Sequence, residues 1–201
     1  MKRAAYRAET YWARPVPGFG DPAARILIVG LAPAAHGANR TGRVFTGDGA
    51  GGSGDFLMTA LHANDLASQP ISRGLDDGLR LTGAYIAAAA RCAPPGNRPT
   101  PAELARCRPH LEAEWDALED VRVVVCLGQI AFLIVLQLLE ARDVRVPRPR
   151  PRFAHGVVVA LEGGPSLVAS YHPSRQNTNT KRLTPPMLAT VFATARALAS
   201  A

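Results

Sequence analysis

Residues 26–56 constrain the fold of this chain more than any other stretch. The segment opens with four apolar residues, the pattern of a buried strand, and Gly30 ends that strand. A loop of small residues and a polar cluster over 36–43 follow, and a helix is predicted to begin near Ser53. A strand, a glycine-containing loop and a helix in this order typically form a ligand site at the carboxyl edge of a parallel sheet.

The rest of the chain repeats the alternation of strands and helices. Apolar runs predict strands over 84–90 and 121–127, and residues 156–161 and 166–171 form a hairpin or two sheet strands. Helices are predicted over 53–67, 100–118, 129–141 and 184–199, with a helical lead-in over 1–14 and an ordered loop over 15–22. Thr100, Pro101 and Glu103 form a helix start with a capping box. The alternation favours a three-layer α/β/α fold with a central, mainly parallel sheet.

Length and composition limit the class of protein. A chain of 201 residues is expected to form one domain, with a mobile loop in the Pro/Arg segment 142–152 that cannot pack. No apolar run is long enough to span a bilayer and no signal peptide is recognisable, so a cytoplasmic monomer is expected. The net charge of +7, carried mostly by arginine, favours a polyanion such as nucleic acid, although a GC-rich genome that encodes arginine in place of lysine is the alternative explanation of the arginine content. Three scattered cysteines argue against a disulfide framework.

Two segments carry a family resemblance. They are residues 30–48, GLAPAAHGANRTGRVFTGD, and residues 171–188, YHPSRQNTNTKRLTPPML. Both closely resemble the B-type, or fifth, family of uracil-DNA glycosylases, and residues 11–22 and 91–107 are similar to that family too. The resemblance implies a central parallel sheet between helices. It also implies hydrolytic excision of uracil, and of hypoxanthine and other deaminated bases, from DNA.

The resemblance assigns His172 and Phe45 to the reaction. His172 follows a strand and precedes Pro173, which restrains its backbone so that the ring can face the mouth. A neutral imidazole there is expected to donate an N–H to the departing base. Phe45 is expected to stack on the flipped base. The alternatives are a histidine that closes the strand for structural reasons and a phenylalanine of the core.

The resemblance further implies a base pocket made of Gly30, Ala32, Pro33, Ala34, His36, Phe45 and Ala88. Sister families carry a carboxylate or amide near Ala34 that handles the water, so another group must orient the water here. Asn39 is the favoured candidate and His36 the second, and the alternative is that either one only holds the loop. Ala88 lies in the strand where related families carry an asparagine that reads the base edge, and its loss predicts a broader base range.

DNA contacts are expected on both sides of the pocket. In the superfamily the loop after His172 enters the minor groove, so Arg175 or Gln176 is expected to fill the space left by the base. Ser174 and Asn177 suit phosphate contacts. Further charge around the mouth is expected from Arg40, Arg43, Lys181 and Arg182, and the alternative for each arginine is a solvated surface residue.

An iron–sulfur cluster on four cysteines is a property of the resembled family. Cys92 and Cys107 match its second pair, whereas the first pair would precede residue 11 and is absent from this sequence. Cys126, in an apolar run, is interpreted as a core residue. A 4Fe-4S cluster is therefore doubtful: either the chain is truncated at its start, or the cluster is absent.

Two other functions remain open from the sequence. One is a non-catalytic protein that binds damaged or single-stranded DNA on a glycosylase-like fold, because both the usual carboxylate and the asparagine are missing. The other is an α/β enzyme that acts on a small nucleotide, although a Gly-Lys-Ser/Thr phosphate loop is missing. A lyase step needs an amine nucleophile, and the two lysines are Lys2 and Lys181, so a monofunctional glycosylase is expected.

Overall fold

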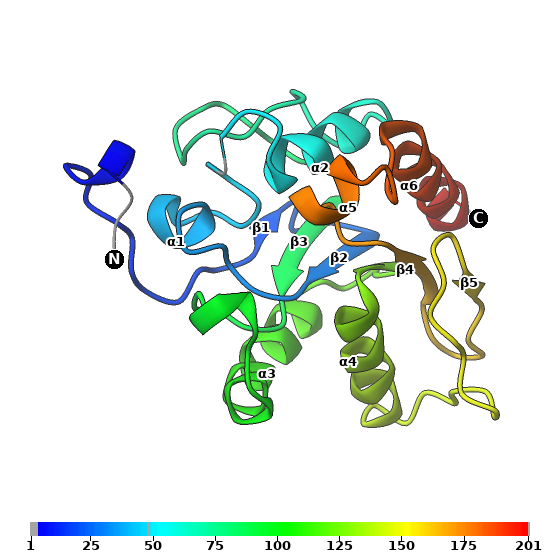
Figure 1. Ribbon diagram of the computed structural model, residues 1–201. Coiled ribbons are helices and arrows are strands. Elements are labelled where there is room, and N and C mark those ends of the chain that lie inside the picture. The colour runs from blue at the N-terminus through cyan, green and yellow to red at the C-terminus, as the bar shows by residue number, and fades with distance from the viewer. Residues whose placement is uncertain (1–3, 48, 201) are drawn as a thin grey trace.

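The computed structural model describes residues 4–47 and 49–200, which form a six-stranded sheet in the order β1-β3-β2-β4-β6-β5 (Figure 1). Its four central strands run parallel and are β3 (Ala84–Ala88), β2 (Ile26–Gly30), β4 (Val123–Leu127) and β6 (Ser166–Ser170). Two short antiparallel strands, β1 (Phe19–Gly20) and β5 (Val158–Val159), close the edges. The predicted central, mainly parallel sheet is confirmed.

Helices cover both faces of this sheet. In Figure 1, α2 (Ser53–His62) and α6 (Pro185–Ser200) lie on one side, and α3 (Pro101–Asp116) and α4 (Gln129–Glu140) lie on the other. Alternate residues of one strand enter different cores: Ile26 and Ile28 pack with α2 and α6, whereas Leu27 and Val29 pack with α4. Burial on both faces explains why the strands are continuous apolar runs in the sequence. The three-layer prediction is therefore confirmed.

The parallel register places the two resemblance segments at one edge of the sheet. Gly30 at the end of β2 pairs with Ala88 at the end of β3, and β4 separates β2 from β6. The loops that follow β2 and β6 therefore open on the same side. Two short helices within these loops, α1 (Ala38–Thr41) and α5 (Arg175–Asn179), were not predicted, because one turn of helix shows no periodicity.

Two predictions near the N-terminus are wrong. In place of a helical lead-in, the described residues 4–14 contain one 3-10 turn, η1 (Ala4–Tyr6), and residues 1–3 lie outside the described part. Residues 15–22 were predicted to be a loop, but Phe19 and Gly20 pair with Ile86 and Tyr85 as an edge strand. Such pairing depends on the partner strand, so the local sequence does not show it.

The structure also corrects the prediction for the Pro/Arg segment 142–152. Its backbone is irregular, as expected, but it packs: Val146 is buried in the core beneath α4. Arg142 pairs with Asp116 of α3 at 2.5 Å, and Arg148 and Arg150 pair with Glu140 of α4. The expectation that the segment cannot pack is therefore wrong, because its arginines find acidic partners on two helices. Its mobility stays a prediction.

The start of α3 follows the predicted capping box. The hydroxyl of Thr100 accepts a hydrogen bond from the Glu103 amide at 3.2 Å, and the Glu103 carboxylate accepts one from the Thr100 amide at 2.7 Å. A second 3-10 turn, η2 (Pro95–Asn97), lies in the loop before this helix. Among the described helices, none is both long and apolar enough to cross a membrane.

Candidate active site

The loops after β2 and β6 enclose a cavity of about 50 Å³ at the carboxyl edge of the sheet. Its walls come from the end of β2, the loop that leads to α2, the first residue of α2 and one residue of the loop after β6. The lining residues are Gly30, Leu31, Ala32, Pro33, Ala34, Ala38, Val44, Phe45, Ser53 and His172. Two segments more than a hundred residues apart in the sequence therefore form one cavity, hereafter the base cavity.

Phe45 is held in an unusual conformation over Gly30. Its backbone φ of 50° lies in the left-handed region that non-glycine residues rarely adopt. A Cβ at Gly30 would lie 3.0 Å from Cε2 of Phe45, and a Cβ at Gly54 would lie 2.2 Å from the Phe45 carbonyl oxygen. Glycine is therefore needed at both positions for the backbone and the ring to approach so closely.

Ala88 lies beside Gly30 but does not line the base cavity. It pairs with Gly30 across the sheet and is 3% exposed, in the same core as α2 and α6. The methyl group offers no hydrogen bond to a ligand. The end of β3 beside Gly30 is therefore apolar.

His172 faces Phe45 from the opposite loop. The two ring centroids lie 5.8 Å apart, with 30° between the ring planes. The carbonyl oxygen of His172 accepts hydrogen bonds from the Ser174 amide and from Nδ2 of Asn177, both at 2.8 Å. Desolvation by burial lowers the pKa of His172 to about 4. The ring is therefore neutral at pH 7, with one nitrogen that donates and one that accepts.

The residues after His172 form the short helix α5. Ser174 caps it, because its hydroxyl accepts a hydrogen bond from the Asn177 amide at 3.4 Å. The described contacts of Ser174 and Asn177 thus hold the turn that carries His172, and their contacts with phosphate stay a prediction. Arg175 and Gln176 are exposed on α5, beside the mouth of the cavity, where a DNA contact is sterically open.

A second cavity of about 200 Å³ adjoins the base cavity and shares Ala34 and Ser53 with it. His36 lines this second cavity and not the first, and its Nδ1 lies 3.0 Å from the hydroxyl of Tyr11. Arg175 lies on the same wall. His36 is therefore a neighbour of the base cavity and not one of its walls.

Asn39 lies outside both cavities, on α1. Its side-chain amide donates to the Ala35 carbonyl oxygen at 3.3 Å, and its own carbonyl oxygen accepts from the Ala13 amide at 3.1 Å. These contacts favour the alternative that Asn39 holds the loop.

Ser53 was missed as a site residue. Sequence analysis used Ser53 only to mark the start of a helix, and Ser53 is indeed the first residue of α2, with Gly52 as its N-cap. Apart from His172, Ser53 is the one residue lining the base cavity that carries a polar side chain, among those described. The sequence signal that could have identified it is its position directly after a glycine-rich loop, because the N-terminus of a helix that begins there commonly faces a ligand.

Arg43 does not contact DNA as predicted. Its side chain is 3% exposed, and Nη2 lies 2.5 Å from Oδ2 of Asp77. Arg40 is also engaged within the protein: it pairs with Glu9 at 2.5 Å and donates to the Gly47 carbonyl oxygen at 2.8 Å. The prediction is wrong for Arg43, and the alternative of a solvated residue is wrong as well, because Asp77, from a loop distant in the sequence, pairs with the buried guanidinium.

Lys181 and Arg182 are exposed, as a DNA contact requires. The guanidinium of Arg182 lies 4.5 Å from the centre of the Tyr171 ring, next to His172. A cation held against an aromatic ring keeps a fixed position while its charge stays accessible. These two residues therefore remain candidates for the positive rim of the mouth.

Cys92 and Cys107 line a third cavity, of about 140 Å³. Cys92 is exposed, and Sγ of Cys107 accepts a hydrogen bond from the Arg91 amide at 3.4 Å. The described residues contain no group of three or more potential metal ligands, whereas a 4Fe-4S cluster needs four thiolates. Cys126 is buried in β4, where desolvation raises the pKa of its thiol. The donors described here therefore do not fit the cluster.

Comparisons with known proteins agree with this geometry. A family model for the uracil DNA glycosylase superfamily matches residues 17–196. The type-5 uracil-DNA glycosylase of Mycobacterium tuberculosis is 52% identical over 99% of this chain and 72% of its own length. Those of Thermus thermophilus and Pyrobaculum aerophilum are 53% and 46% identical, over 98% and 96% of this chain and 86% and 80% of their own lengths. The chain therefore belongs to the uracil-DNA glycosylase superfamily and, within it, to the type-5 family.

Proposed function

We propose that this protein hydrolyses the N-glycosidic bond of uracil, and of hypoxanthine and other deaminated bases, in DNA. The observation that carries the proposal is the base cavity, in which Phe45 and a neutral His172 face each other at 5.8 Å. The aromatic ring offers a surface on which a base can stack, and the neutral imidazole offers an N–H that can stabilise the base as it departs. Membership of the type-5 family supports the same reaction class.

The first step is entry of the base into the cavity. A target base must leave the helical stack, at a cost of a few kcal/mol, and stacking on the ring of Phe45 offsets part of that cost. The left-handed turn at Phe45 and the absence of a Cβ at Gly30 bring the ring to the cavity wall. The backbone of residues 32–34, which line the cavity, then borders the base.

The second step is cleavage of the bond between C1′ and the base nitrogen. The electron pair of that bond leaves with the base, and an N–H of His172 donates to the developing anion. A neutral donor can stabilise that anion without itself being consumed as an acid. Because the pKa of His172 is about 4, the ring stays in this form across the physiological range.

The water that completes the reaction adds its oxygen to C1′ and gives up a proton to solvent, and the base anion takes up a proton in turn, which leaves an abasic site and a neutral free base. We propose that the hydroxyl of Ser53 orients this water, because Ser53 lines both the base cavity and the wider cavity that opens beside it. Among the described residues that line the base cavity there is no lysine, so no covalent amine step is derived. The reaction is that of a monofunctional glycosylase.

The apolar walls support a broad range of bases. Besides His172 and Ser53, the described residues that line the cavity have apolar side chains or none. Ala88 supplies no amide at the end of β3. A cavity without paired donors and acceptors discriminates weakly among bases that share a carbonyl oxygen. Uracil and hypoxanthine both present such an oxygen to His172.

DNA is the proposed partner, bound by one copy of the chain. Arg175, Gln176, Lys181 and Arg182 are exposed around the mouth, and the net charge of +7 favours a polyanion. Cys92 and Cys107 line a different cavity from His172, so the steps above use neither thiol.

The test is a glycosylase assay on oligonucleotides that contain one uracil or one hypoxanthine opposite each normal base. We expect alkali-sensitive breaks at the modified base, and their loss in the His172→Ala variant. If a folded protein at high concentration releases no base, the proposal is wrong. Salt-dependent binding of the same oligonucleotides without release would then identify the alternative, a DNA-binding protein that does not cut.

A further inference from the structure

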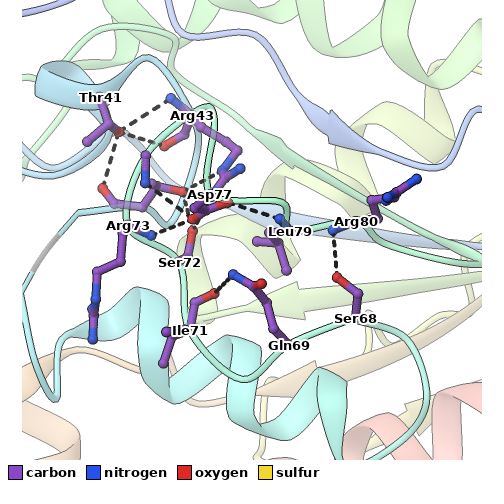
Figure 2. Close-up of polar contacts among 12 residues, drawn as sticks. Thr41, Arg43, Ser68, Gln69, Ile71, Ser72, Arg73, Asp77, Leu79 and Arg80 are labelled. Carbon is purple, nitrogen blue, oxygen red and sulfur yellow. Dashed lines mark hydrogen bonds and ion pairs between the residues drawn. The ribbon is translucent and has the colours of Figure 1, made fainter.

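A buried polar network lies beneath the turn that carries Phe45. It joins Arg43 and Thr46 to Ser72 and Asp77, which belong to residues 68–80, hereafter the anchoring loop. Figure 2 shows the side chains of Arg43, Ser72 and Asp77 converging from the two segments. Arg43, Thr46 and Ser72 are at most 3% exposed, so water does not compete for these contacts.

The contacts of the network are short and mutually supporting. Nη2 of Arg43 lies 2.5 Å from Oδ2 of Asp77 and 3.0 Å from Oγ of Ser72. Nε of the same arginine donates to Oγ1 of Thr46 at 3.0 Å, and the hydroxyls of Thr46 and Ser72 are 2.5 Å apart. Each hydroxyl therefore bonds both the arginine and the other hydroxyl, which restricts the network to one arrangement.

Asp77 is fixed by its own loop before it meets Arg43. Its carboxylate accepts hydrogen bonds from the amides of Arg73, Gly74 and Leu79, at 2.7, 3.2 and 3.0 Å. The Arg43 side chain and these amides hold the pKa of Asp77 well below its usual range, against the effect of burial. The carboxylate is thus a rigid, charged anchor and not a mobile side chain.

The network grips the chain on both sides of Phe45. Arg43 precedes Phe45 by two residues and Thr46 follows it directly, and both are tied to the anchoring loop. The left-handed backbone at Phe45 is sterically unfavourable for a residue with a Cβ, so the surrounding structure must impose it. The observed contacts supply that constraint.

We propose that Asp77 is a positioning residue for base excision: through Arg43 and Thr46 it holds the Phe45 turn so that the ring stays at the wall of the base cavity. The inference rests on the proposed function, because it treats Phe45 as the surface on which the base stacks. It gives the anchoring loop a role in the reaction, although none of the described residues of that loop lines the base cavity.

A double-mutant cycle tests the inference. Asp77→Asn, Phe45→Ala and the double variant are compared with the parent protein in single-turnover release of uracil from DNA. We expect Asp77→Asn to lower the rate constant about tenfold while DNA binding changes little, because only the geometry of the ring is disturbed. In the Phe45→Ala background the same change is expected to lower the rate constant less than about twofold, because coupled residues are not additive.

Asp55→Asn is the matched control. Asp55 pairs with Arg73 of the same anchoring loop at 2.8 Å and accepts a hydrogen bond from the Ser72 amide at 3.4 Å, but it bonds none of the side chains of Arg43, Thr46 and Ser72. A loss of release in this variant equal to that in Asp77→Asn would overturn the inference, as would an Asp77→Asn effect of the same size with and without Phe45. Asp77→Glu, which restores the charge, is expected to recover part of the rate.

Two further measurements keep the test decisive. If Asp77→Asn does not fold, Ser72→Ala removes one hydroxyl and leaves the Arg43–Asp77 pair intact, and the same cycle is run with it. The ring signals of Phe45, assigned by NMR through their loss in Phe45→Leu, are expected to shift in the Ser72 or Asp77 variant and not in Asp55→Asn. Unchanged ring signals would overturn the inference. If the variants show shifted ring signals but the parent protein itself releases no base, the positioning of the ring is supported and the proposed function is refuted.

Discussion

Replacing His172 by glutamine tests whether burial lowers the pKa of this ring. If it does, the stabilities of the parent and variant proteins depend differently on pH. Glutamine keeps a polar, donor-bearing side chain but does not titrate. In the folded protein, burial lowers the pKa of His172 from 6.5 to about 4. Between these values the unfolded chain binds more protons than the folded one, so the free energy of unfolding falls as the pH falls. Above pH 6.5 both states hold a neutral ring and the effect is absent.

The size of the effect follows from the same two values. One pKa unit corresponds to about 1.4 kcal/mol, so the full loss below pH 4 is about 3 kcal/mol, and about 2 kcal/mol of it is reached at pH 5. Because the ring is partly exposed at the cavity mouth, solvent screening makes these values upper limits.

Urea unfolding at pH 7, 6 and 5 measures this difference. We expect the advantage of the parent protein over His172→Gln to shrink by up to about 2 kcal/mol from pH 7 to pH 5. Other groups, among them His155, whose pKa is also lowered by burial, are present in both proteins and cancel in the comparison. A pH-independent difference would refute the reasoning, because it would mean that the ring titrates alike in the folded and unfolded chains.

Further predictions concern the walls and rim of the cavity. Phe45→Ala is expected to slow single-turnover release of uracil about 10- to 100-fold, the worth of one stacking contact, while Phe45→Tyr retains most of the rate. Ser53→Ala is expected to lower the rate about tenfold with unchanged DNA affinity, and Ser53→Thr to restore it; equal rates would show that another group orients the water. Arg175→Ala is expected to weaken DNA binding and to reduce its salt slope by about one, as a titration at several salt concentrations would show. Arg43→Ala, by contrast, is expected to cost about 3–5 kcal/mol of stability in urea unfolding, because it leaves the Asp77 carboxylate, whose side chain is only 12% exposed, without its ion-pair partner.

The elements with strong local patterns were predicted closely. The strand at residues 121–127 contains β4, and the helix after Thr100 begins at Pro101 with its capping box. A strand buried on both faces needs apolar residues throughout, and a capped helix needs particular residues at its start. Both therefore give a recognisable local pattern in the sequence. The edge strand β1 and the helices α1 and α5 left no such mark, since each is only two to five residues long.

Two residues that line the base cavity were also singled out from the sequence. His172 and Phe45 belong to two motifs, and parallel strands bring the ends of such motifs to one edge of a sheet. What the motifs did not show was which polar residues line the cavity. Ser53 does so and Asn39 does not, because the direction of a loop side chain depends on the backbone turns around it.

The sequence by itself determined the fold class, the family and the two rings of the base cavity, because local patterns and motif order carry that information. Only the tertiary structure decided the role of Arg43. Its charge predicted a surface contact with DNA, but Asp77 lies 34 positions further along the chain and encloses it. Whether a charged side chain meets solvent or an internal partner depends on which distant segment folds over it, and no local pattern records that contact.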